Sequence, residues 1–249
     1  MRSLSTVSLP ALFLAASLFS VAGCADAEES VALSEDGLRD GELTYERPAI
    51  GLMLNNDWTG CTATLIDDDT LVTAAHCFDY GSQAPSGKRY GAFHIKKSDT
   101  DEQIFEYDGF VSLGRKSGSD DIALVHLMKK VPADVAKPLA ISTSAPSDAS
   151  NELVTMYGVG CQHRPGLFGP SDEPEPNMGK KQKRTFEMGP VRYGCPGDSG
   201  GPTVRKDGSV FRVTSKMYFV EIRGWGRGDS FGDVVKWRDR IQQQISAWR

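Results

Sequence analysis

From Pro48 to the C-terminus, the chain consists mainly of short apolar stretches of strand length, each bounded by Gly, Asp, Asn or Ser. The clearest are 49–54, 62–66, 70–73, 122–127, 153–157, 209–214 and 217–220. Such stretches between turn-forming residues are typical of β-strands. Many short strands with almost no helical periodicity predict an all-β chain that folds as a sandwich or as barrels.

One helix is predicted, at the C-terminus. Large apolar residues recur there at three- and four-residue steps, namely Val234, Trp237, Ile241, Ile245 and Trp248. This spacing places them on one face of a helix. The stretch 164–190 is rich in Pro, Gly and charged residues, so we expect a long exposed loop there.

The N-terminus has the composition of an export signal. A basic start at Arg2 precedes an apolar run from Leu9 to Val21, which is too short to span a bilayer comfortably. The segment Val21–Cys24 resembles a bacterial lipobox, in which Cys24 would carry the lipid. The alternative is cleavage after the A-x-A pattern at 25–27, which would remove Cys24.

Both alternatives export the protein, either as a membrane-anchored lipoprotein on the periplasmic or outer face or as a secreted protein. We therefore expect a signal peptide with lipobox over residues 1–24. The acidic segment 25–37 is predicted to be a tether or pro-segment, and 38–249 to be the folded domain. The net charge of -5 comes from intermixed acids and bases, which argues against nucleic acid as a partner. Membrane contact is expected only through the lipid.

The chain has five cysteines, which leaves one without a partner in an oxidising compartment. Lipidation or removal of Cys24 accounts for the odd one. Cys61, Cys77, Cys161 and Cys195 then remain for two disulfides, and the residues alone allow three pairings.

Three short motifs carry groups with catalytic chemistry: TAAHC at 73–77, DDIAL at 120–124 and GDSGGP at 197–202. A serine hydroxyl is a weak nucleophile until a neutral imidazole accepts its proton, and a carboxylate must hold the other ring N–H. His76 and Ser199 supply the base and the nucleophile. Asp120 and Asp121 compete for the carboxylate role, because neighbouring strand residues face opposite sides and only one can reach His76.

Together and in this order, the motifs resemble the chymotrypsin/trypsin family of serine endopeptidases, from about Leu38 to the C-terminus. The resemblance implies two packed antiparallel Greek-key β-barrels with a C-terminal helix. It selects Asp121, which stands directly before Ile-Ala-Leu, and places His76 and Asp121 in the first barrel and Ser199 in the second. Peptide bonds would be hydrolysed by a monomer through an acyl-enzyme, with no cofactor or metal.

The same resemblance implies further site residues. The backbone N–H groups of Gly197 and Ser199 would form the oxyanion hole, for which a glycine at 197 adopts backbone angles that other residues avoid. A Cys61–Cys77 disulfide would close a loop carrying His76 and contribute about 3 kcal/mol on a chain-entropy model. The remaining pair, Cys161–Cys195, would brace the oxyanion loop.

The specificity pocket departs from the family pattern. The resemblance implies that Tyr193, six residues before Ser199, would occupy the pocket floor where trypsin-like members carry Asp, and that Ser215 would belong to the pocket wall. Without that carboxylate we expect small or apolar target residues ahead of basic ones. Asp229 and Asp233 are the alternative, as a displaced acidic floor.

The activation sequence also departs from the family, in which cleavage exposes an N-terminus reading roughly Ile-Val-Gly-Gly. Here the nearest candidate starts at Leu38, within Leu-Arg-Asp-Gly, and would require cleavage after Gly37. Asp198 is present to receive the new amine. The competing hypothesis is a protease that is active without this cleavage.

Two other functions are consistent with parts of the sequence. A protease-fold protein that only binds partners would explain the unusual pocket and activation segment, although such proteins usually lose a triad residue. An esterase is disfavoured, because the G-x-S-x-G motif and the Ser-Asp-His order of that class are missing. His94, His126 and His163 lack metal-ligand spacing and catalytic context.

Overall fold

A computed structural model describes residues 38, 41–55, 60–78, 91–114, 117–160, 179–189, 193–195, 197–216 and 230–249, and the backbone of 86–87. All of them belong to the compact unit Ser34–Arg249. The predicted signal, lipobox and tether lie outside the described residues. No helix in the described ranges is long and apolar enough to cross a membrane.

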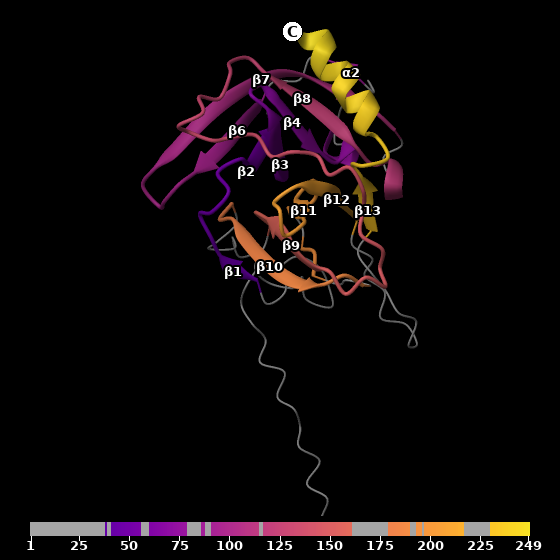
Figure 1. Cartoon of the computed structure of the whole chain (residues 1–249). Coiled ribbons are helices and arrows are strands. Elements are labelled where there is room, and N and C mark those ends of the chain that lie inside the picture. Colours follow the sequence, from indigo (N-terminus) through magenta and orange to yellow (C-terminus); the bar gives the residue numbers. More distant parts are fainter. Residues whose placement is uncertain are drawn as a thin grey trace, which may run out of the picture. The chain divides into compact units, whose positions relative to one another are not determined.

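The first half of this unit forms a closed barrel (Figure 1). Its strands are β2 (Ile50–Asn55), β3 (Gly60–Asp67), β4 (Thr70–Thr73), β5 (Ser86–Gly87), β6 (Gly91–Lys96), β7 (Glu102–Ser112) and β8 (Ala123–Leu127). They lie in the order β5-β7-β6-β2-β3-β4-β8, and an additional β7–β8 pairing closes the sheet. Alternate residues such as Met53, Leu65, Phe93 and Val125 face inward and fill the core.

The second half, together with β1 from the start of the unit, forms a six-stranded antiparallel sheet. Its strands, in spatial order, are β1 (Glu42–Leu43), β10 (Gln182–Glu187), β9 (Leu153–Gly158), β11 (Pro202–Val204), β12 (Val210–Lys216) and β13 (Ser230–Asp233). Within the described ranges, no strand pairing joins the two ends of this sheet. The all-β class is thus confirmed as one closed barrel, a second sheet and a C-terminal helix.

Two structural expectations differ from what the chain forms. The predicted loop over 164–190 is wrong at 182–187, where β10 pairs along β9. β10 escaped prediction because its inward positions include Gln182 and Arg184, so its apolar alternation is lost. The strand predicted at 217–220 lies outside the described residues.

Helix α2 (Arg238–Trp248) confirms the predicted C-terminal helix, although residues 234–237 form turns before it. Ile241 and Ile245 are its buried residues. The Trp248 ring lies 5.1 Å from the ring of His126 on β8, which fixes the end of the helix against the barrel.

A mixed apolar cluster joins the two halves and the helix. Ile50, Leu124, Tyr157, Val213 and Ile241 all belong to it. The burial of such residues is the main stabilising contribution to the contact between the halves.

Lys181 adds hydrogen bonds at the contact between the two halves. Its Nζ donates hydrogen bonds to the carbonyls of Arg47 and Ile50, at 2.8 Å and 3.0 Å. Burial lowers the pKa of Lys181 to about 7, although the charge of Glu46 opposes the shift. The amine that connects β10 to the start of β2 therefore has a protonation state that changes near neutral pH.

A third cluster forms the core of the second sheet. It contains Leu38, Val154, Met156, Phe186, Met188 and Phe211. Leu38 is fully buried although it precedes the first strand, and its φ is 41°. Leu38 is thus part of the folded domain.

Candidate active site

His76 lies in a short 3₁₀ helix, η1 (Ala75–Phe78), directly after β4. The predicted Cys61–Cys77 disulfide is present and ties this turn to β3. Asn55 adds a second tie, because its side-chain amide donates to the Cys77 carbonyl at 2.9 Å. The imidazole therefore extends from a turn that is fixed on both sides.

Asp121 is fully buried and follows η2 (Gly118–Asp120). Its Oδ1 accepts from the His76 backbone N–H at 2.9 Å, and its Oδ2 lies 2.7 Å from His76 Nδ1. The Ser215 hydroxyl also donates to Oδ2. Burial opposes ionisation, but His76 and the Ser215 hydroxyl outweigh it, so the pKa of Asp121 lies below its usual value.

Asp120 points elsewhere, because its carboxylate pairs with Lys236. The two adjacent aspartates are separated because Asp120 is the last residue of η2 and Asp121 is its C-cap, and not by the strand alternation that we expected. Asp121 is the aspartate that hydrogen-bonds to His76.

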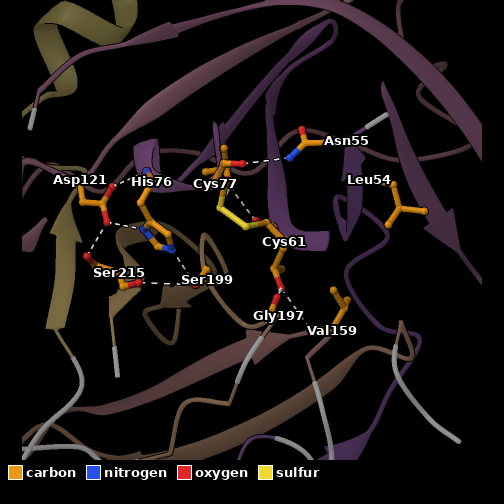
Figure 2. Close-up of a disulfide and its surroundings, with 12 residues drawn as sticks. Leu54, Asn55, Cys61, His76, Cys77, Asp121, Val159, Gly197, Ser199 and Ser215 are labelled. Atoms are coloured by element: carbon orange, nitrogen blue, oxygen red, sulfur yellow. Dashed lines mark hydrogen bonds and ion pairs between the residues drawn. A yellow bond between two sulfur atoms is a disulfide. The ribbon is translucent and has the colours of Figure 1, made fainter. Parts of the chain in front are cut away.

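Ser199 completes the arrangement from the second half of the domain. Its Oγ lies 2.9 Å from His76 Nε2 and 3.5 Å from the carbonyl oxygen of Ser215. Figure 2 shows Asp121, His76 and Ser199 in one continuous line of contacts. With Nδ1 facing a carboxylate, the ring proton belongs on Nδ1, which leaves Nε2 free to accept the Ser199 proton.

The loop before Ser199 has the glycine-dependent geometry that an oxyanion hole needs. Gly197 has a φ of 96°, and a Cβ there would lie 2.7 Å from the Cα of Gly160. The buried Asp198 carboxylate accepts from the N–H groups of Gly160 and Cys195, both at 2.8 Å. These contacts hold the loop from both sides.

Thr62 is a residue that sequence reasoning missed. Its Oγ1 donates to the Gly197 carbonyl at 2.9 Å and accepts from the Val159 N–H at 3.0 Å. Its own backbone N–H donates to the Ser199 carbonyl at 2.8 Å. A threonine in an apolar strand has no sequence signal that distinguishes this use from ordinary packing.

The predicted pocket residues occupy different places. The half-buried Tyr193 ring packs 5.2 Å from the Phe186 ring, and the Arg184 guanidinium stacks 3.7 Å from its centre. Ser215 is fully buried, and its hydroxyl donates to Asp121, a contact that the sequence did not predict. Asp233 Oδ1 accepts from the Lys236 N–H at 2.9 Å, as a turn residue does.

Some predicted features lie partly or wholly beyond the described residues. Cys195 is disulfide-bonded, whereas its predicted partner Cys161 is not among the described residues. Gly37, Asp229 and His163 also lie outside the described residues.

Outside the site formed by His76, Asp121 and Ser199, several other histidine and acidic side chains are in ion pairs with neighbouring residues. His94 pairs with Glu102 at 2.9 Å, on neighbouring strands of the barrel. Among the described side chains, Asp67, Asp68 and Asp69 form the one acidic group that is close enough to hold a cation. Asp67 is already paired with Arg249 and Asp68 with Lys130, as expected for a solvated turn.

The trypsin family model matches residues 42–234, so the chain belongs to the trypsin family of serine proteases. It is 26% identical over 194 residues to Trypsin-1 of Gadus morhua, an alignment that covers 70% of this chain and 78% of the relative. It is 25% identical over 213 residues to the anionic trypsin of Bos taurus, covering 78% and 83%.

Proposed function

We propose that the protein is a serine endopeptidase that hydrolyses peptide bonds of proteins through a covalent acyl-enzyme. The observation that carries the proposal is the position of His76 between its two partners. Nε2 lies 2.9 Å from Ser199 Oγ, and Nδ1 lies 2.7 Å from Asp121 Oδ2. Hydrogen bonds of these lengths allow one imidazole to accept a proton and remain oriented.

In the proposed reaction, Ser199 Oγ attacks the carbonyl carbon of the substrate as its proton moves to His76 Nε2. The imidazolium formed is stabilised by Asp121, and the N–H groups of Gly197 and Ser199 stabilise the oxyanion. His76 then protonates the leaving amine, the C–N bond breaks and Ser199 carries the acyl group. A water molecule deprotonated by His76 hydrolyses this ester and restores the serine.

Labelling with a fluorophosphonate probe tests the proposal. The expected result is one covalent adduct on Ser199 and none in S199A, with the fold of the variant unchanged by circular dichroism. An unlabelled wild-type domain that is folded and fully oxidised would favour a protease-fold protein that only binds partners.

For specificity, we propose that the enzyme cleaves beside small or apolar residues ahead of Lys or Arg. The support is that Tyr193 presents a phenol packed between Phe186 and Arg184, and no carboxylate takes the place of the family's pocket aspartate among the described side chains. A cation in such a pocket would lose water without gaining a charge partner. Profiling with a peptide library tests this, and a dominant Lys or Arg preference would contradict it.

We also propose that the protein is exported and anchored through a lipid on Cys24. The lipobox-like segment Val21–Cys24 after an apolar run supports this. Mass spectrometry of the mature N-terminus in a bacterial host tests it. Cleavage after Ala27, without a lipid, would contradict the anchor but not the export.

A further inference from the structure

We infer that Thr62 is a positioning residue for the oxyanion hole, acting through its side-chain hydroxyl. The inference rests on the proposed function and deepens it. Thr62 lies in β3 of the first barrel, whereas the loop that it contacts belongs to the second half of the domain.

The carbonyls of both proposed oxyanion donors are bonded to this one residue. The Gly197 carbonyl accepts from Thr62 Oγ1 at 2.9 Å, and the Ser199 carbonyl accepts from the Thr62 N–H at 2.8 Å. The Gly197 carbonyl shares its peptide plane with the Asp198 N–H, and the Ser199 carbonyl shares its plane with the Gly200 N–H. The two bonds therefore fix the planes that follow Gly197 and Ser199, and the plane that carries the Ser199 N–H lies between them. The N–H groups of Gly197 and Ser199 are thereby kept available for the substrate.

The direction of the hydroxyl is itself determined by a third contact. The Val159 N–H donates to Thr62 Oγ1 at 3.0 Å, so the hydroxyl proton is left to point at the Gly197 carbonyl. Figure 2 shows Gly197 and Val159 beside each other next to Cys61. A continuous chain of donors and acceptors therefore links the end of β9 to the oxyanion loop.

The immediate surroundings make the contact rigid. Thr62 is fully buried, and its carbonyl accepts from the Thr73 hydroxyl at 2.8 Å, near the turn that carries His76. The neighbouring Cys61 is fixed by its disulfide with Cys77. The hydroxyl of Thr62 is thus attached to the same elements that hold the proposed base.

The same strand provides a matched control. Thr64 lies two residues further along β3 on the same face and is also fully buried. Its hydroxyl makes no hydrogen bond with any residue that the structure describes. Replacement of either threonine by valine removes a buried hydroxyl and conserves the shape of the side chain, so the two variants differ in the partners that are lost.

The test compares T62V, T62S and T64V by steady-state hydrolysis of a peptide substrate, with active sites counted by fluorophosphonate titration. We expect kcat per active site to fall at least tenfold in T62V, with KM changed less than threefold. T62S and T64V should remain within threefold of the wild type in kcat. The affinity for a peptide boronate, which forms a tetrahedral adduct with Ser199, should fall in parallel with kcat in T62V.

Stability and activity are separated in this design. If T62V fails to fold, T62A and T62S replace it as a pair that differs only in the hydroxyl, and T62A is expected to have a tenfold lower kcat than T62S. If the wild type is labelled but kcat per active site is the same in T62V as in the wild type, or the same in T62A as in T62S, the role of Thr62 is overturned. The proposed protease function would still stand. An unlabelled wild type would instead overturn the proposed protease function, and this inference with it.

Discussion

The Ser215 hydroxyl donates a hydrogen bond to Oδ2 of Asp121, across the contact between the second sheet and the closed barrel. This bond and the two from His76 give a fully buried carboxylate three donors. Hydrogen bonds to the charged form are what keep such a group ionised in spite of its burial.

Replacing Ser215 with alanine should destabilise the domain at pH 7 by about 1–3 kcal/mol, because a buried carboxylate loses a donor. The pKa of Asp121 is lowered on folding, so its contribution is present above the unfolded pKa of about 3.9 and is lost as pH falls through the folded pKa. Urea unfolding of S215A and the wild type at pH 7 and pH 3 measures the difference, which should be smaller at pH 3.

Thr214→Val is the control for this experiment. Thr214 is the neighbouring residue on β12 and is almost fully buried, and its hydroxyl has no hydrogen-bond partner within the described part of the chain. T214V should leave stability nearly unchanged. An equal loss of stability in S215A and T214V would show that the hydrogen bond from Ser215 to Asp121 does not stabilise the fold more than an ordinary buried hydroxyl.

Gly197→Ala should reduce kcat by about 100- to 1,000-fold, the range expected when an oxyanion donor is removed. The reason is steric, because the new Cβ would lie 2.7 Å from the Cα of Gly160 and φ is 96°. Gly118→Ala is the matched control, since Gly118 has a φ of 62° with no heavy atom within 4 Å of the added Cβ. G118A should lose about 1–2 kcal/mol of stability and keep its kcat. Similar kcat values for the two variants would contradict the role assigned to the Gly197 N–H.

Leu38→Ala should lower the free energy of unfolding by about 2–5 kcal/mol, the usual cost of truncating a buried leucine. Leu38 is 0% exposed in the core of the second sheet, whereas Leu43 on β1 is 52% exposed. L43A is therefore the control and should change stability by less than about 0.5 kcal/mol. Urea unfolding measures both, and a similar small effect of L38A would mean that the segment before β1 is not part of the core.

Because of the lowered pKa of Lys181, we expect the free energy of unfolding to rise as the pH increases through the weakly alkaline range. Burial lowers its folded pKa to about 7, while the unfolded value is about 10.4. Between these two values the unfolded chain binds more protons, so stability rises with pH. A neutral amine keeps two N–H groups, which is enough for the bonds to the carbonyls of Arg47 and Ile50.

Lys181→Met isolates this contribution from other titrating groups. The wild type should gain stability relative to K181M when urea midpoints are compared from pH 6.5 to pH 9. A constant difference over this range would show that Lys181 titrates normally in the folded protein.

The sequence predicted the motifs well and the contacts between them poorly. TAAHC, DDIAL and GDSGGP contain the three residues that the structure brings together, because each motif includes the turn that positions its side chain. Thr62 and Ser215 could not be found in this way. Their partners lie in the other half of the domain, and a hydroxyl in a strand has the same local pattern whatever it contacts.

The strands that were missed have a physical explanation. β7 alternates exposed and half-buried residues over much of its length, so its apolar signal is weak. β10 has polar residues on its inward face, where Arg184 stacks on the Tyr193 ring. Prediction from apolar alternation fails where the interior of the fold is itself polar.

The division of the site between the two halves has a consequence for biosynthesis. His76 and Asp121 emerge from the ribosome long before Ser199, which in turn depends on β12 for the Ser215 contact to Asp121. A nascent chain therefore holds a base and its carboxylate without a nucleophile. The proposed hydrolysis therefore begins only after the chain has been made through Ser215 and folded, so a shorter chain cannot cleave its neighbours.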